Sequence, residues 1–91
     1  MLVRTASGFE LEINKDTLDD WELLEDLAAL EGGDRGRIVP VARRVLGPDG
    51  LSKLIEHCRT PEGRAPATAV ETELFEIFKL LKEDQEEVKN S

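Results

Sequence analysis

Residues 16–30 read DTLDDWELLEDLAAL, and this stretch decides the fold. At about 100° of rotation per residue, its apolar side chains fall on two adjacent edges of one helix. The first edge carries Leu23, Leu27 and Leu30, and the second carries Trp21, Leu24 and Ala28. Together they cover roughly half of the circumference, more than the stripe of about 100° that one core contact requires. The sequence therefore predicts a helix that is contacted from more than one side.

Polar residues define the ends and the outer face of this helix. Asp16 or Thr17 is expected to supply the N-cap oxygen, and acids in the first turn suit the positive end of the helix dipole. The pair at 32–33 is expected to end the helix, because glycine readily adopts the left-handed conformation at which helices stop. The remaining arc is acidic and contains Asp19, Glu22, Glu25 and Asp26.

The charge of the chain limits its partners. Its 91 residues make one small domain, and 20 acids against 12 lysines and arginines give a net charge of −8, the wrong sign for binding a phosphate backbone. Residues 16–31 hold seven acids and no base, whereas residues 35–64 hold seven bases and three acids. We expect the basic middle to fold against the acidic ends. The alternative is that the middle or the acidic arc meets a charged partner.

The amino-terminal segment alternates apolar and polar residues. Phe9, Leu11 and Ile13 point to one face, and a turn that contains Gly8 precedes them. This pattern predicts a β-hairpin over residues 2–13. A lone hairpin is marginally stable in water, so its apolar face must lie on the helices or on another subunit.

Three further helices are predicted after the first. One covers about 39–46, with Pro40 in its first turn and Gly47 at its end, and another follows Asp49 as cap. The longest begins at Pro66 and reaches about Lys82 or beyond. Its core stripe consists of Val70, Leu74, Ile77, Phe78 and Leu81. The predicted fold is mainly α, about four helices in a compact domain of residues 1–82 with a short hairpin. Residues 83–91 are predicted to be an acidic frayed or disordered tail.

No residue pattern predicts a catalytic, cofactor or metal site. His57 lies beside the apolar stripe of its helix and is expected at the surface without a catalytic partner. Cys58 lies on that stripe and is expected to be a small buried side chain; a single cysteine also suits a reducing cytosol. The acids of the first helix lack the loop spacing of a calcium site.

Nucleic acids and membranes are not expected as partners. The two helices around residues 47–50 could be mistaken for a helix-turn-helix, but Lys53, Glu56, His57 and Arg59 are a mixed set on an acidic protein. The start of the chain does not resemble a signal peptide. No apolar run approaches the roughly 18 residues needed to cross a bilayer.

Some apolar residues fall outside the predicted core. Phe75 and Leu80 leave the core stripe of the longest helix on opposite flanks. Trp21 is expected to anchor the core or an interface. The candidate partner-binding residues are therefore Phe75, Leu80, Leu23, Leu27, Leu30 and Trp21. Self-association through the same edges, or through the hairpin, is the alternative.

Several of these segments resemble the small tail assembly chaperones of long-tailed bacteriophages. The resemblance runs from about residue 8 to residue 81. It consists of packing and turn patterns, without a catalytic motif. The segments read GFELEI (8–13), DDWELLE (19–25), GPDGL (47–51) and GRAP (63–66), the last ahead of ELFEI (73–77).

The resemblance implies a non-enzymatic role in the host cytoplasm. Such chaperones coat the hydrophobic tape measure protein, keep it soluble and recruit tail tube subunits, and they are absent from the finished virion. Many are made in a short form and in a longer form produced by ribosomal frameshift. A short chain with a polar tail would suit the short form.

Two classes of function stay open at this point. The first is an assembly chaperone or helical binding module, which spare apolar surface on an acidic body would suit. The second is a small acidic regulatory or inhibitory protein that binds a host protein. The bases clustered in the middle of the chain argue against mimicry of a nucleic acid. No residues support an enzyme.

Overall fold

The amino-terminal segment forms the predicted hairpin. In the computed structural model, which describes the backbone of residues 1–90 and the side chains of residues 1–83, β1 (Leu2–Arg4) pairs antiparallel with β2 (Glu10–Glu12). Val3 lies opposite Leu11, and the Thr5 amide donates to the Phe9 carbonyl at 2.9 Å. Gly8 adopts a φ of +94° in the turn, a conformation that side chains rarely allow.

The first long helix begins later than the sequence predicts. α1 (Trp21–Glu31) is capped by Asp20, whose Oδ1 accepts from the amides of Glu22 and Leu23 at 3.0 and 3.4 Å. The predicted caps, Asp16 and Thr17, lie instead in the short 3₁₀ helix η1 (Lys15–Leu18). The prediction of the cap was wrong because several neighbouring residues have equal capping chemistry. The end of the helix is confirmed at Gly32, and Gly33 has a φ of +107°.

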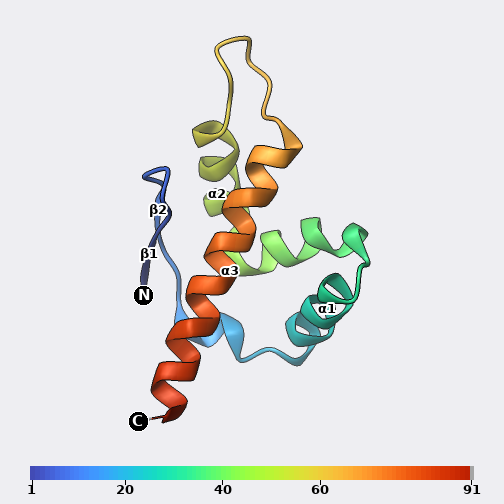
Figure 1. Cartoon of the computed structure of the whole chain (residues 1–91), viewed down its shortest axis with the longest axis vertical. Coiled ribbons are helices and arrows are strands. Elements are labelled where there is room, and N and C mark those ends of the chain that lie inside the picture. Colours follow the sequence, from blue (N-terminus) through green and yellow to red (C-terminus); the bar gives the residue numbers. More distant parts are fainter. Residues whose placement is uncertain (91) are drawn as a thin grey trace.

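The structure contains three α-helices in the backbone of residues 1–90, so the prediction of about four is wrong. The two predicted middle helices form one element, α2 (Ile38–His57), which follows the 3₁₀ helix η2 (Arg35–Arg37). At Gly47 the backbone leaves helical geometry (φ +75°, ψ 164°), and the two arms of α2 meet at a sharp bend (Figure 1). The sequence signals at 47–50 therefore mark a bend inside α2.

The longest helix runs along the whole molecule. α3 (Ala67–Asn90) passes beside the hairpin and across α2 (Figure 1). Its helical bounds agree with the prediction of a helix that reaches Lys82 or beyond. The predicted frayed or disordered tail covers residues 83–91. Apart from Glu83, the side chains of this segment lie outside those that the structure describes. In the part of the chain that is described, no helix is long and apolar enough to cross a membrane.

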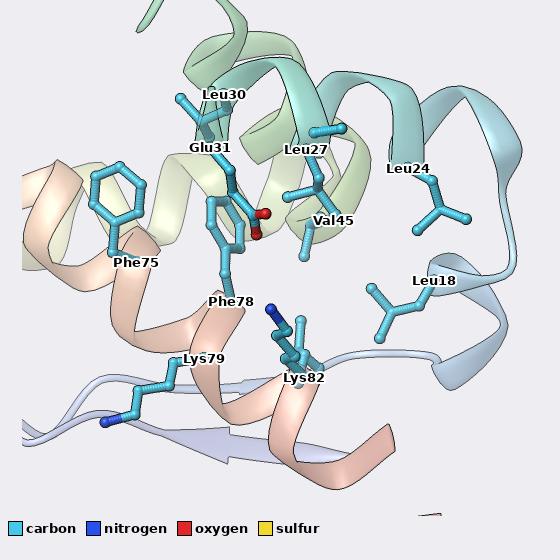
Figure 2. A pocket seen from close by; sticks show the side chains of 12 residues that line it. Leu18, Leu24, Leu27, Leu30, Glu31, Val45, Phe75, Phe78, Lys79 and Lys82 are labelled. Atoms are coloured by element: carbon cyan, nitrogen blue, oxygen red, sulfur yellow. The ribbon is translucent and has the colours of Figure 1, made fainter. Parts of the chain in front are cut away.

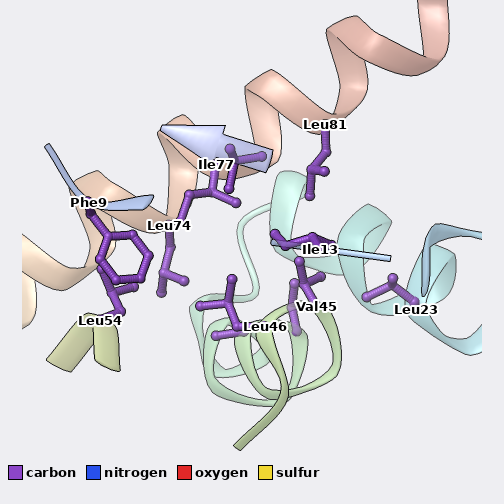
Figure 3. Close-up of a cluster of buried hydrophobic side chains, with 12 residues drawn as sticks. Phe9, Ile13, Leu23, Val45, Leu46, Leu54, Leu74, Ile77 and Leu81 are labelled. Carbon is purple, nitrogen blue, oxygen red and sulfur yellow. The ribbon is translucent and has the colours of Figure 1, made fainter. Parts of the chain in front are cut away.

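One hydrophobic core joins all of these elements. The most deeply buried side chains come from the hairpin, α1, both arms of α2 and α3, and several are shown in Figure 3. They include Val3, Phe9, Ile13, Leu23, Val41, Val45, Leu54, Leu74, Ile77 and Leu81. The hairpin therefore packs on the helices of its own chain. Truncating such a side chain to alanine typically costs about 2–5 kcal/mol.

The expected pairing of the basic middle with the acidic stretches is confirmed. Arg37 Nη1 lies 2.6 Å from Asp26 Oδ1, and Arg44 Nη1 lies 3.3 Å from Asp20 Oδ2. Arg35 at the start of η2 forms an ion pair with Glu71 of α3. Pairs of this kind at a surface contribute at most about 1 kcal/mol each. They link α1 to η2 and α2, and they link α3 to η2.

Candidate partner-binding groove

An apolar groove of about 520 Å³ lies between α1 and α3 (Figure 2). This volume falls in the range of about 300–1,000 Å³ that is typical of ligand sites. Apart from three charged residues at its edges, its lining is apolar. The lining residues are Leu18, Leu24, Leu27, Ala28, Leu30, Glu31, Val45, Phe75, Phe78, Lys79, Leu81 and Lys82.

The groove follows from the way in which the helices share the core. α1 packs on α2 and η2, and α3 packs on α2 and β1. Because both helices pack on α2 and only weakly on each other, the surfaces that they turn toward each other are incompletely filled. Val45 of α2 lies between them and lines the groove from that side (Figure 2).

The two apolar edges of α1 have different environments. Leu23 and Leu30 of the first edge are 0% and 8% exposed and belong to the core, although Leu30 also lines the groove. On the second edge, Leu24 is 49% exposed and lines the groove together with Ala28. The width of the apolar surface predicted for this helix therefore has two causes, one core contact and one exposed contact surface.

Trp21 lies in solvent, not in the core. Its side chain is 74% exposed at the first residue of α1, so the prediction that it anchors the core is wrong. Its helical position is one turn before Leu24, which places its apolar surface next to the groove. A role as an interface anchor stays a prediction.

Aromatic residues form the opposite wall. Phe75 is 45% exposed and meets Phe78 edge-to-face, with ring centroids 6.2 Å apart and an interplanar angle of 89°. This arrangement is favourable for aromatic pairs and holds both rings at the groove. The exposure of Phe75 agrees with its predicted place outside the core stripe.

The remaining predicted partner-binding residues are distributed unevenly. Leu27 lines the groove and is half-buried. Leu80 is half-buried against the core and is not among the lining residues, so it lies apart from Phe75. Sequence reasoning missed Leu18, Lys79 and Lys82 as lining residues and assigned Phe78 to the core. The spacing of residues 75, 78, 79 and 82 marks one helical face and was the available signal.

Charged side chains occupy the edges of the groove. Lys79 and Lys82 stand on the α3 edge, and Glu31 stands on the α1 edge (Figure 2). No ion pair joins any of the three to another side chain within residues 1–83. They are therefore free to pair with groups on a bound molecule.

A second polar cluster fastens the hairpin to the helices. Ser7 Oγ donates to Glu73 Oε1 of α3 and lies 2.9 Å from His57 Nε2 of α2. The Ala6 amide donates to both carboxylate oxygens of Glu76 at 3.0 and 3.3 Å. The His57 ring also packs against Phe9, with centroids 5.4 Å apart.

The geometry of this cluster differs from that of a catalytic serine. Since Ser7 donates its single hydroxyl proton to Glu73, the contact with His57 suits the tautomer that carries a proton on Nε2. In a hydrolytic triad the histidine instead accepts the serine proton. The cluster joins the hairpin turn to α2 and α3, and His57 is exposed as predicted. Cys58 is half-buried, and burial and then the charge of Glu73 raise the pKa of its thiol.

Metal ligands do not gather in the part of the chain whose side chains are described: no group of three or more His, Cys, Asp or Glu could hold an ion there. The chain matches no family model, and no curated protein or solved structure is significantly similar to it.

Proposed function

We propose that this chain is a non-enzymatic helical binding protein that holds an apolar segment of another protein in the α1–α3 groove. The observation that carries the proposal is the groove itself, whose lining includes the exposed side chains of Leu24 and Phe75. Large apolar side chains that cluster at one exposed place typically mark an interaction site.

Within that class, we propose a bacteriophage tail assembly chaperone. It would bind the tape measure protein in the host cytoplasm, keep it soluble and help to recruit tail tube subunits. The support is the resemblance of five segments to such chaperones, together with a groove that suits apolar, non-catalytic contacts. The net charge of −8 would also keep coated complexes apart by mutual repulsion.

The alternative is a small acidic regulatory or inhibitory protein that binds a host protein through its acids. The ion pairs disfavour this alternative. Within the acidic arc, Asp26 pairs with Arg37 and Arg44, and the cap residue Asp20 also pairs with Arg44, so part of that charge is neutralised within the chain. The chaperone proposal rests on the groove and does not depend on those acidic side chains.

A capture experiment tests the proposed function. The chain is co-expressed with the tape measure protein of the same phage, and the soluble fraction of that protein is measured with and without the chain. Leu24→Asp and Phe75→Asp should both reduce capture while the far-UV spectrum stays native, because each places a charge at the groove.

The chain offers a matched control. Leu2 is 56% exposed on β1, away from the groove, and resembles Leu24 in type and exposure. Leu2→Asp should therefore leave capture unchanged. Equal loss in both leucine variants, or no loss in either groove variant, would reject the groove as the site. Light scattering on the same variants shows whether self-association uses it instead.

Leu80→Asp should behave differently from Phe75→Asp. Leu80 packs on the core, so a charge there should destabilise the fold before it affects binding. If charge reversal at Glu22 and Glu25 or added salt abolished capture while both groove variants still bound, the acidic arc would be the site and the alternative function would gain support.

A further inference from the structure

The groove has few groups with which to satisfy a bound backbone. Its lining side chains are apolar except for Glu31, Lys79 and Lys82 at the edges. The lining residues come from η1 and the three α-helices, with none from β1 or β2. A bound extended chain would need the exposed edge of a β-strand or other polar groups, because buried amides and carbonyls require hydrogen-bond partners. An α-helix satisfies its own backbone and needs only an apolar face.

The edges of the groove differ in charge. The α3 edge carries two lysines, and the α1 edge carries Glu31. In Figure 2 the Lys82 ammonium points toward the groove and the Lys79 ammonium points away from it, while the Glu31 side chain enters from α1. A segment that fills the groove therefore meets a positive group on one flank and a negative group on the other.

Resting on the proposed function, we propose that the occupant is an amphipathic helix of the partner protein with oppositely charged flanks. Its apolar face fills the groove, its acidic flank pairs with Lys82, and its basic flank pairs with Glu31. The opposite charges on the two edges of the groove determine which helix binds. They also fix the direction in which the bound helix lies. The exposed surfaces of Trp21 and Leu24 extend the apolar contact beyond the cavity.

Designed peptides test this inference against the full chain. Each peptide is 18 residues long and repeats leucine at positions i, i+3, i+4 and i+7. The charged peptide has glutamate on one flank of its helix and lysine on the other. The glutamine peptide has glutamine on both flanks. At low salt the charged peptide should bind about tenfold more tightly than the glutamine peptide, the scale expected of two exposed pairs. In roughly 0.5 M salt the difference in affinity between the two peptides should vanish, while both peptides still bind.

Charge reversal identifies the residues that select the peptide. Lys82→Glu should abolish the advantage of the charged peptide and leave binding of the glutamine peptide unchanged. Lys53→Glu is the matched control, because Lys53 is an exposed lysine of α2 that does not line the groove. The advantage should persist in that control.

The outcomes separate the inference from the proposed function. Equal binding of both peptides at all salt concentrations would overturn the charge selection and leave the groove as a binding site. Binding of decanoate or of an extended peptide in place of both helical peptides would overturn the helical occupant. If no peptide bound, and Phe75→Asp also left capture of the tape measure protein unchanged, the inference and the groove would both be rejected.

Discussion

The Arg44 guanidinium lies 3.3 Å from the Asp20 carboxylate that caps α1. One residue thus fixes the start of the helix and ties it to the first arm of α2. Asp20→Ala removes both interactions and should lower the unfolding free energy by about 1 kcal/mol, since that is typical for loss of an N-cap. Asp20→Asn keeps the cap oxygen and should cost less. Urea denaturation measures the difference, and equal losses in the two variants would contradict the capping role.

The bend of α2 depends on Gly47. Its φ of +75° with ψ of 164° belongs to a region that is essentially restricted to glycine. A Cβ at this position would meet nothing within 4 Å, so the cost of Gly47→Ala comes from the backbone alone. We expect a loss of about 1–3 kcal/mol in thermal or urea unfolding. Gly36→Ala, which needs no positive φ, is the control; a Gly47→Ala variant as stable as that control would contradict this account.

The contact of Ser7 with Glu73 should hold the hairpin turn in place. Glu73 is 9% exposed, and its Oε2 has no hydrogen-bond partner among the described residues. Ser7→Ala would leave Oε1 without its donor as well and should destabilise the fold by about 1–3 kcal/mol.

The double variant Ser7→Ala, Glu73→Met supplies the control for that prediction. It removes the buried carboxylate together with its donor and should recover much of the loss. Hydrogen exchange at the hairpin amides locates the effect. If the double variant were less stable than Ser7→Ala, the contact would not be the cause.

Cys58 should react slowly with alkylating reagents at neutral pH. Burial, and then the charge of Glu73, raise the pKa of its thiol, so the reactive thiolate is scarcer than in a free cysteine. The alkylation rate by iodoacetamide should therefore rise only at a higher pH than in the urea-unfolded chain. Glu73→Gln removes the smaller contribution and should shift the profile slightly toward lower pH. A native profile that matches the unfolded one would contradict this prediction.

Local patterns predicted the core but could not predict the groove. Leu74, Ile77 and Leu81 share a helical face whatever surrounds them, so periodicity identified them as core. The cap of α1 was ambiguous because Asp16 and Asp20 have the same chemistry, and Arg44, which pairs with Asp20, is distant in sequence.

Long-range contacts explain the remaining differences between prediction and structure. Ser7, His57 and Glu73 come from three separate segments, so no sequence window contains their contact. The groove likewise depends on the placement of α1 relative to α3. The large apolar side chain of Trp21 suggested burial, but the structure shows that its position on α1 faces solvent.

Trp21 should contribute little to stability and should report on binding. With 74% of its side chain exposed, Trp21→Ala should change the unfolding free energy by less than about 1 kcal/mol. Leu54→Ala is the control for a fully buried side chain and should cost about 2–5 kcal/mol. Native fluorescence should resemble that of the unfolded chain and be quenched by iodide.

Filling of the groove should shift this fluorescence to shorter wavelengths, because a bound helix would cover the exposed indole beside Leu24. The shift should follow the binding curve of the apolar helical peptides and be absent in Leu24→Asp. Dilution distinguishes this effect from self-association. If a second copy of the chain covered Trp21, the emission without peptide would lie at short wavelengths at high concentration and would move to longer wavelengths on dilution. A blue emission that persists at all dilutions without peptide would instead contradict the exposed position of Trp21, and with it the extension of the groove surface along α1.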